Sequence, residues 1–233
     1  MKLSIIIPVY NEEKTVGEVI NRVKKEKLVS VEKEIVVVDD ASSDRTAKIL
    51  KKQKGIKLIS HKVNKGKGSA VRNGIKNSSG DIVLIQDADL EYNPSDYARL
   101  LKPIVEGKTK VVYGSRLVNY PFRLFGKGKT PLITHYIGNK TLTFITNLLF
   151  GSSITDMETC YKVFKRVVLD DIEIKAKRFE FEPEITAKLL KAGERICEIP
   201  IEVKPRSYSD GKKISWRDGF IALWTLIKYR FVD

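Results

Sequence analysis

The first half of the chain alternates strand-like and helix-like segments, and this order constrains the fold more than any other feature. Short runs rich in Ile and Val indicate buried strands, and apolar residues three or four apart indicate amphipathic helices. The predicted strands cover residues 3–7, 34–39, 56–60, 82–86 and 111–114, and the predicted helices cover 15–26, 43 or 44 to 53, 68–77 and 94–105. Such alternation is typical of an α/β domain with a mostly parallel sheet and right-handed crossovers.

The second half of the chain has fewer and longer elements. Helices are predicted over residues 132–150, 182–192 and 216–231, the last of them amphipathic, and a strand over 195–203. Residues 122–130 indicate a mobile loop, and residues 204–213 a basic loop. A chain of 233 residues can bury a full core. We therefore expect residues 1–233 to form a single domain with two halves, about 1–115 and 116–233.

The charge balance indicates an anionic partner. The chain has 43 Lys and Arg against 29 Asp and Glu, a net charge of +14. A nucleotide, an acidic membrane face or a nucleic acid would suit this surplus. Because zinc-finger spacing and aromatic-rich RNA-binding motifs are missing, we expect no nucleic acid partner.

Cysteine use and hydropathy indicate a cytoplasmic protein. Cys160 and Cys197 are the only cysteines and lie in apolar surroundings, which fits a reducing compartment. The sequence shows neither the pattern of a signal peptide nor an apolar run of about 20 residues, so we expect no leader and no transmembrane helix.

Two carboxylates, Asp87 and Asp89, follow the predicted strand 82–86. Parallel sheets bind ligands at the carboxyl ends of their strands. Carboxylates this close repel each other. A divalent cation beside them would offset this repulsion and could also bind a diphosphate. The pattern predicts a metal–nucleotide site, and a solvated acidic turn is the alternative.

The ends of the first two predicted strands carry further polar residues. A nucleoside needs an acidic hydrogen-bonding group, which Asp39 or Asp40 can supply, and a flat apolar wall, which Val9 or Tyr10 can supply. Helix capping explains a carboxylate at one strand end, but three such ends in one sheet indicate a binding site.

A glycine turn at Gly66-Lys67-Gly68 opens the predicted helix 68–77. Helix N-termini favour anions, so the turn is either a contact for a diphosphate or base, or a purely structural turn. Its spacing matches neither a P-loop nor a Rossmann fingerprint.

Five motifs stand in a fixed order along the chain. They are Pro8-Val9-Tyr10-Asn11-Glu12, Val38-Asp39-Asp40-Ala41-Ser42-Ser43-Asp44, Asn64-Lys65-Gly66-Lys67-Gly68, Asp87-Ala88-Asp89 and Gly114-Ser115-Arg116. Together they resemble the inverting family-2 glycosyltransferases over nearly the whole chain. Within that family the chain most resembles the polyprenyl-phosphate glycosyltransferases, the group of the dolichyl-phosphate mannose synthases.

The resemblance implies a GT-A fold, a Rossmann-like sheet flanked by helices, and a nucleotide-sugar donor. It implies Mg²⁺ or Mn²⁺ at Asp87 and Asp89, with Glu91 as a further ligand where some relatives carry glutamine. It assigns the nucleotide sugar to Pro8, Tyr10, Glu12, Asp39, Lys67, Asp87, Arg206 and Lys212. The half 1–115 would then bind the donor, and the half 116–233 the acceptor.

The resemblance also assigns an acceptor site. The segment Thr155–Lys162 is similar to the family's catalytic segment, in which Asp156 would orient or activate the acceptor beside Asp89 and Arg116. Arg116 would face the acceptor phosphate. His135 and Asn139, four apart on one helical face, are either further phosphate contacts or a polar stripe.

Two basic segments lie near the end of the chain. Arg206, Lys212 and Lys213 belong to a loop that is either solvated or, as in the family, a lid over the diphosphate. The final helix places Phe220, Leu223, Trp224, Ile227 and Phe231 on one face, flanked by Lys228 and Arg230. This face either packs on the domain or lies at a membrane interface.

The sequence therefore predicts a metal-dependent inverting glycosyltransferase. It would move a hexose, with mannose favoured, from GDP-mannose or a UDP-sugar to a polyprenyl phosphate at the cytoplasmic membrane face. One alternative is a soluble glycosyltransferase acting on a saccharide or a small polar acceptor. Others are a nucleotidyltransferase, which also uses paired carboxylates and metal, and a non-catalytic binding module.

Overall fold

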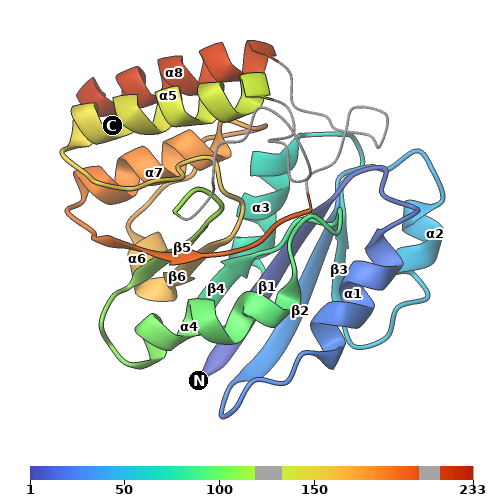
Figure 1. Cartoon of the computed structure of the whole chain (residues 1–233). Coiled ribbons are helices and arrows are strands. Elements are labelled where there is room, and N and C mark those ends of the chain that lie inside the picture. The colour runs from blue at the N-terminus through green and yellow to red at the C-terminus, as the bar shows by residue number, and fades with distance from the viewer. Residues whose placement is uncertain (119–132, 205–215, 233) are drawn as a thin grey trace, which may run out of the picture.

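The computed structural model describes residues 1–118, 133–204 and 216–232 (Figure 1). Within these residues the strands form one seven-stranded sheet in the order β3-β2-β1-β4-β6-β5-β7. The strands are β1 Lys2–Val9, β2 Glu32–Asp39, β3 Lys57–Ser60, β4 Ile82–Ile85, β5 Val111–Ser115, β6 Lys162–Lys165 and β7 Ile196–Pro200. Four of the six strand pairings are parallel, so the predicted mostly parallel sheet is confirmed.

Helices cover both faces of the sheet (Figure 1). They are α1 Val16–Lys25, α2 Thr46–Leu50, α3 Lys67–Lys76, α4 Tyr97–Val105, α5 Ile133–Phe150, α6 Arg166–Asp170, α7 Phe181–Lys191 and α8 Trp216–Phe231, with a 3-10 turn η1 at Pro94–Asp96 before α4. Helix α3 packs on β1 and β2, while α4 packs on β5, β6 and β7. Helices α5 and α8 lie side by side and both contact α7.

The core forms where the apolar runs of the sequence meet. The side chains of Ile5, Ile6 and Ile7 and of β4 are fully buried. Burial of each such side chain contributes about 1.5–3 kcal/mol to stability, which explains why these runs form central strands.

Strand β6 and helix α6 add to the predicted elements. Strand β6 enters between β4 and β5 and is antiparallel to both. Its first residue, Lys162, is fully buried, where Nζ donates to the carbonyls of Met157 and Thr159 at 2.8 Å each and lies 3.8 Å above the Tyr113 ring. Because lysine is rarely buried without partners, the sequence alone would place Lys162 at the surface.

Helix α2 is shorter than predicted. Asp44 Oδ1 accepts a hydrogen bond from the Thr46 N–H at 2.9 Å. The N-cap residue is Arg45 rather than the predicted Ser43 or Asp44, and its side chain makes no cap hydrogen bond. The helix then ends at Leu50 rather than at Gln53. No helix among the described residues is both long and apolar enough to cross a membrane.

Candidate active site

The carboxyl ends of β2, β1 and β4 lie next to one another at one edge of the sheet. The three strands are adjacent and parallel, and Asp39, the last residue of β2, is in register with Val9 of β1. Because β6 is antiparallel to both β4 and β5, the strand β5 also ends at this edge, just before Arg116. The topology therefore brings the predicted donor and acceptor residues to the same edge.

Asp39 and Asp40 are both buried but have different partners. Asp40 accepts hydrogen bonds from the N–H groups of Lys65 at 2.9 Å and Gly66 at 2.7 Å, and its Oδ1 lies 2.6 Å from His61 Nδ1. Asp39 Oδ1 accepts from the Ser42 N–H at 3.1 Å. Asp40 thus shapes the loop before α3, and Asp39 is the better nucleoside candidate of the two.

The loop after β1 is tied to the loop after β2. Asn11 Oδ1 accepts from the Ser43 N–H at 2.8 Å, and the Glu12 N–H donates to Thr46 Oγ1 at 2.9 Å. Tyr10 is exposed beside them, whereas Pro8 is half-buried. Asn11 has a φ of 49°, a strained backbone that is common at ligand sites.

The glycine turn before α3 is filled by protein rather than left open for an anion. The Gly68 N–H donates to the Arg178 carbonyl at 3.1 Å, and the Ser69 N–H donates to the Lys177 carbonyl at 3.0 Å. A Cβ on Gly66 would lie 2.4 Å from the Lys177 carbonyl oxygen. Of the two readings of this turn, these contacts favour the structural one.

Lys67 lies between two carboxylates. Its Nζ is 2.9 Å from Asp87 Oδ1 and 2.8 Å from Glu182 Oε1, a residue of α7. The structure thus places the predicted donor residues Lys67 and Asp87 in direct contact. Sequence reasoning missed Glu182, since an acidic residue in the first turn of a helix is ordinarily a dipole partner.

Asp89 and Glu91 continue the acidic segment after β4, and Asp89 Oδ1 accepts from the Glu91 N–H at 3.1 Å. Among the described residues, no group of three His, Cys, Asp or Glu side chains converges to form a metal cage. Mg²⁺ commonly uses only one or two carboxylates, with water and substrate phosphates completing the shell. The carboxylate oxygens of Asp87, Asp89 and Glu91 are donors of the type that suits a metal held jointly with a diphosphate.

Asp156 forms the centre of a second group of charged and polar side chains, after that of Lys67, Asp87 and Glu182. It is fully buried and accepts three hydrogen bonds from Arg116, at 2.9 Å from the backbone N–H, 2.7 Å from Nε and 2.8 Å from Nη2. Asn139 Nδ2 of α5 donates to Oδ1 at 2.9 Å. Burial opposes ionisation, but the Arg116 charge and these hydrogen bonds lower the pKa of Asp156 below its usual value.

Tyr92 lies close to Asp87 and also to the Arg116–Asp156 pair. Its hydroxyl accepts a hydrogen bond from the Cys160 N–H at 3.0 Å. Burial raises the pKa of Tyr92, and the charges of Arg116, Asp87 and Asp156 also act on it. Asp87, Arg116 and Asp156 therefore all lie near Tyr92.

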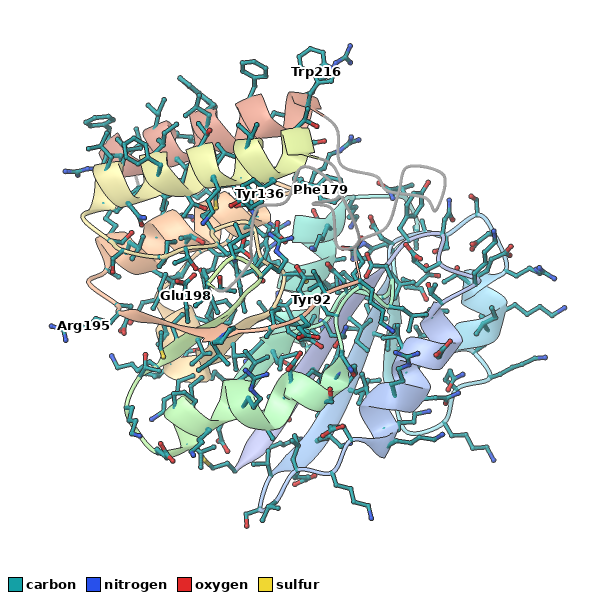
Figure 2. All side chains as sticks on the ribbon, in the orientation of Figure 1. Tyr92, Tyr136, Phe179, Arg195, Glu198 and Trp216 are labelled. Carbon is teal, nitrogen blue, oxygen red and sulfur yellow. The ribbon has the colours of Figure 1, made fainter. Side chains whose placement is uncertain are left out.

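The segment around Asp156 is anchored from β7. Glu198 (Figure 2) accepts from the N–H groups of Thr155 at 2.7 Å and Asp156 at 3.0 Å. Strand β7 does not alternate clearly between buried and exposed residues, so no pattern in the sequence indicated this role for Glu198.

Glu158 is the least satisfied group near this site. One of its oxygens, Oε1, is buried with no hydrogen-bond partner among the described residues. Burial and the nearby Glu182 raise the pKa of Glu158 to about 7, while burial lowers the pKa of Lys162 to about 8. Neither residue had a distinguishing sequence signal.

Several predicted residues cannot be placed. The loop 122–130, most of the loop 204–213 and with it Arg206, Lys212 and Lys213 lie outside the described residues. The backbone of His135 belongs to α5, four residues before Asn139, but its side chain is also outside the described part.

The chain is similar in sequence to known glycosyltransferases. Residues 4–173 match the family described as Glycosyl transferase family 2. The chain is 31% identical over 96% of its length to UDP-N-acetylglucosamine–dolichyl-phosphate N-acetylglucosaminyltransferase of Methanococcus voltae, and covers 94% of that protein. It is also 31% identical over 91% of its length to dolichol-phosphate mannosyltransferase of Pyrococcus furiosus, of which it covers 59%.

The fold also has a counterpart among solved structures. Glucosyl-3-phosphoglycerate synthase from Mycobacterium tuberculosis, in complex with Mn²⁺, UDP and phosphoglyceric acid, has a TM-score of 0.75 over 100% of this chain and 79% of that one, with 19% identity. This likeness confirms the predicted GT-A fold. The match over residues 4–173 shows that the chain belongs to glycosyl transferase family 2.

Proposed function

We propose that the protein transfers a hexose, with inversion and with a divalent metal, from a nucleotide sugar to a polyprenyl phosphate. The observation that carries the proposal is that β4, which precedes Asp87 and Asp89, and β5, which precedes the Asp156-paired Arg116, end at the same edge of the sheet. GDP-mannose is the favoured donor and a UDP-sugar the other candidate. Relatives named for transfer to dolichyl phosphate support the lipid acceptor.

The donor side of the site would hold the nucleotide sugar through its nucleoside and its diphosphate. Asp39 and Tyr10 would contact the nucleoside at the ends of β2 and β1. Asp87 and Asp89, with Glu91 beside them, would hold Mg²⁺ or Mn²⁺ together with the diphosphate. Such a metal neutralises the charge that develops on the leaving diphosphate.

The acceptor side would position a phosphate that is already ionised. Arg116 uses Nε and Nη2 on Asp156, and its Nη1 has no hydrogen-bond partner among the described residues. That N–H group is available for the acceptor phosphate. Asp156 would hold Arg116 in place and orient or activate the acceptor, and its lowered pKa suits an ionised carboxylate in that role. Asn139 donates to Asp156 and so supports the same geometry.

A membrane contact would give the enzyme access to a lipid acceptor. The outer faces of α5 and α8 carry large apolar side chains that are at least 66% exposed: Phe144, Leu148, Trp216, Phe220, Trp224 and Phe231. Figure 2 shows Trp216 pointing away from the body of the protein. The opposite face of α8 is the one that packs inward, through Ala222, Leu226 and Tyr229.

This apolar face matches an anionic bilayer surface. Large apolar side chains exposed together on two neighbouring helices are unusual for a face in contact with water. The basic residues Arg217, Lys228 and Arg230 of α8 are exposed beside it and suit acidic lipid headgroups. The proposed contact is peripheral, at the cytoplasmic membrane face, with residues 1–115 binding the donor and 116–233 the acceptor.

The test is a transfer assay with GDP-mannose, UDP-N-acetylglucosamine and UDP-glucose, each with and without a short polyprenyl phosphate. Mass spectrometry of the lipid fraction would report transfer, and EDTA would test the metal requirement. Transfer from one donor that needs both lipid and metal is expected. Transfer to a soluble saccharide or small polar acceptor without lipid would overturn the acceptor assignment. If no donor is hydrolysed and none supports transfer, the proposed activity is wrong.

A further inference from the structure

Asp87 contacts a cation of the protein itself, the Lys67 ammonium. The Nζ–Oδ1 distance is 2.9 Å, and the second contact of Nζ, with Glu182 Oε1, is 2.8 Å. The side chains of Lys67, Asp87 and Glu182 are 16%, 21% and 6% exposed, so water screens these contacts poorly. Hydrogen bonds between opposite charges are about twice as strong as neutral ones.

The glycine turn explains how Lys67 reaches both carboxylates. Close packing of Gly66 and Gly68 on the carbonyls of residues 176–178 brings the start of α3 against the segment that leads into α7. Lys67 is the first residue of α3, and Glu182 lies in the first turn of α7. The turn therefore serves to place Lys67, a role that differs from a phosphate cradle.

We propose that Lys67 is a resident counter-cation that keeps divalent metal off Asp87 until a nucleotide diphosphate arrives. This inference rests on the proposed function, in which Asp87 binds the metal. Glu182 holds the ammonium beside Asp87, so a metal arriving alone meets a positive charge on the oxygen it needs. A diphosphate brings negative charge that receives both the metal and the ammonium.

The charge state of Lys67 agrees with this role. Its Nζ lies 2.9 Å from Asp87 Oδ1 and 2.8 Å from Glu182 Oε1, and both carboxylates favour the charged ammonium. Metal and nucleotide are consequently expected to bind with positive coupling.

The experiment is Mn²⁺ binding to the full chain without nucleotide, measured by the electron paramagnetic resonance signal of free Mn²⁺. Lys67→Met should tighten the Mn²⁺ Kd about 10-fold, because the competing charge is gone. Glu182→Gln should weaken it, because Asp87 then becomes the only carboxylate partner of the ammonium. Lys65→Met is the matched control: it removes the same charge from an exposed side chain in the same loop, and should change the Kd less than twofold.

A second readout is the coupling itself. Adding GDP or UDP should tighten Mn²⁺ binding strongly in the wild type and much less in Lys67→Met. If the single variant does not fold, Lys67→Met/Glu182→Gln removes a charge of each sign and should still bind Mn²⁺ more tightly than the wild type.

Three results would overturn the inference. One is a Lys67→Met Kd equal to that of Lys65→Met, and another is a Kd weaker than that of the wild type. The third is Mn²⁺ binding by neither Lys67→Met nor the double variant. Asp87→Asn separates this inference from the metal site: if it abolishes Mn²⁺ binding while Lys67→Met changes nothing, only the role of Lys67 is wrong. Unchanged binding in Asp87→Asn would instead contradict the metal assignment.

Discussion

Arg116 and Asp156, 40 positions apart in the sequence, form a two-pronged ion pair, with Nε 2.7 Å from Oδ2 and Nη2 2.8 Å from Oδ1. Asp156 is fully buried and the Arg116 side chain is 23% exposed. Two parallel hydrogen bonds fix the plane of the guanidinium as well as its position. The pair therefore sets where the remaining N–H groups of Arg116 point.

We expect Asp156→Asn to damage both stability and activity. An amide cannot accept all the hydrogen bonds of Arg116 and leaves its charge without a partner, which costs about 3 kcal/mol in a buried pair. Transfer should fall on the order of 10²-fold because the acceptor is misplaced. Urea denaturation and the transfer assay measure the two effects. Asp170→Asn, at an exposed position of α6, is the control and should match the wild type.

The assignment of Asp89 to the metal predicts that Asp89→Asn weakens activity on the order of 10²-fold, with partial recovery at high Mn²⁺. Steady-state rates across a Mn²⁺ titration would measure this. Asp81→Asn, just before the opposite end of β4, should leave the titration unchanged. Full activity of Asp89→Asn at low Mn²⁺ would remove Asp89 from the metal site.

The free energy of unfolding should fall as pH rises from about 4.5 to about 7. The pKa of Glu158 is raised from 4.5 to about 7, so the folded protein keeps a proton that the unfolded chain releases in this window. Burial is the main cause, and the charges of Glu182 and Asp156 add to it, whereas Lys162 and Arg116 oppose it.

Glu158→Gln mimics the protonated carboxyl and should flatten this fall. We expect a gain on the order of 2 kcal/mol over the wild type at pH 8 and little gain at pH 4.5. Urea denaturation at both pH values provides the comparison. Glu173→Gln, at an exposed position, should keep the wild-type pH dependence. An equal effect of Glu158→Gln at both pH values would contradict a raised pKa.

Gly66→Ala should destabilise the protein by about 3 kcal/mol, because it combines two costs. The residue has a φ of 90°, which disfavours any side chain, and a Cβ would overlap the Lys177 carbonyl at 2.4 Å. Gly107→Ala separates the two, since Gly107 has a φ of 72° with nothing within 4 Å. Its expected cost is about 1 kcal/mol. Similar melting temperatures for both variants would show that the carbonyl moves aside.

The outer face of α8 should govern binding to lipid vesicles. Phe220→Ser and Trp224→Ser each remove an apolar side chain available for burial in the bilayer, so each should weaken binding on the order of 10-fold. Co-sedimentation with vesicles containing acidic phospholipid measures this. Val29→Ser, at a position 92% exposed, is the matched control and should bind as the wild type does.

If the apolar face instead joins two copies of the chain, the same α8 variants will shift the sedimentation of the protein without lipid. Loss of a dimer with unchanged vesicle binding would contradict the membrane assignment. Unchanged vesicle binding by both variants and a monomeric wild type would also contradict it.

The sequence by itself determined every described strand except β6, and the edge of the sheet to which the predicted donor residues belong. Apolar runs such as 82–85 can only be buried, and a carboxylate directly after such a run must lie at the strand's end. Because strands linked through helices run parallel, Asp39 and Asp87 had to come to the same edge. These conclusions depend on local patterns, which a sequence shows directly.

The tertiary structure alone decided which charged groups meet. Lys67 with Glu182, and Arg116 with Asp156, join segments that are distant in the sequence, and no local pattern encodes their contact. The choice between Asp39 and Asp40 depended on a loop that folds onto Asp40. Likewise, α8 has apolar residues on both faces, and only its packing against α5 and α7 determined which face is exposed. Charge pairing and exposure depend on the three-dimensional arrangement of neighbours, and periodicity along one segment cannot specify that arrangement.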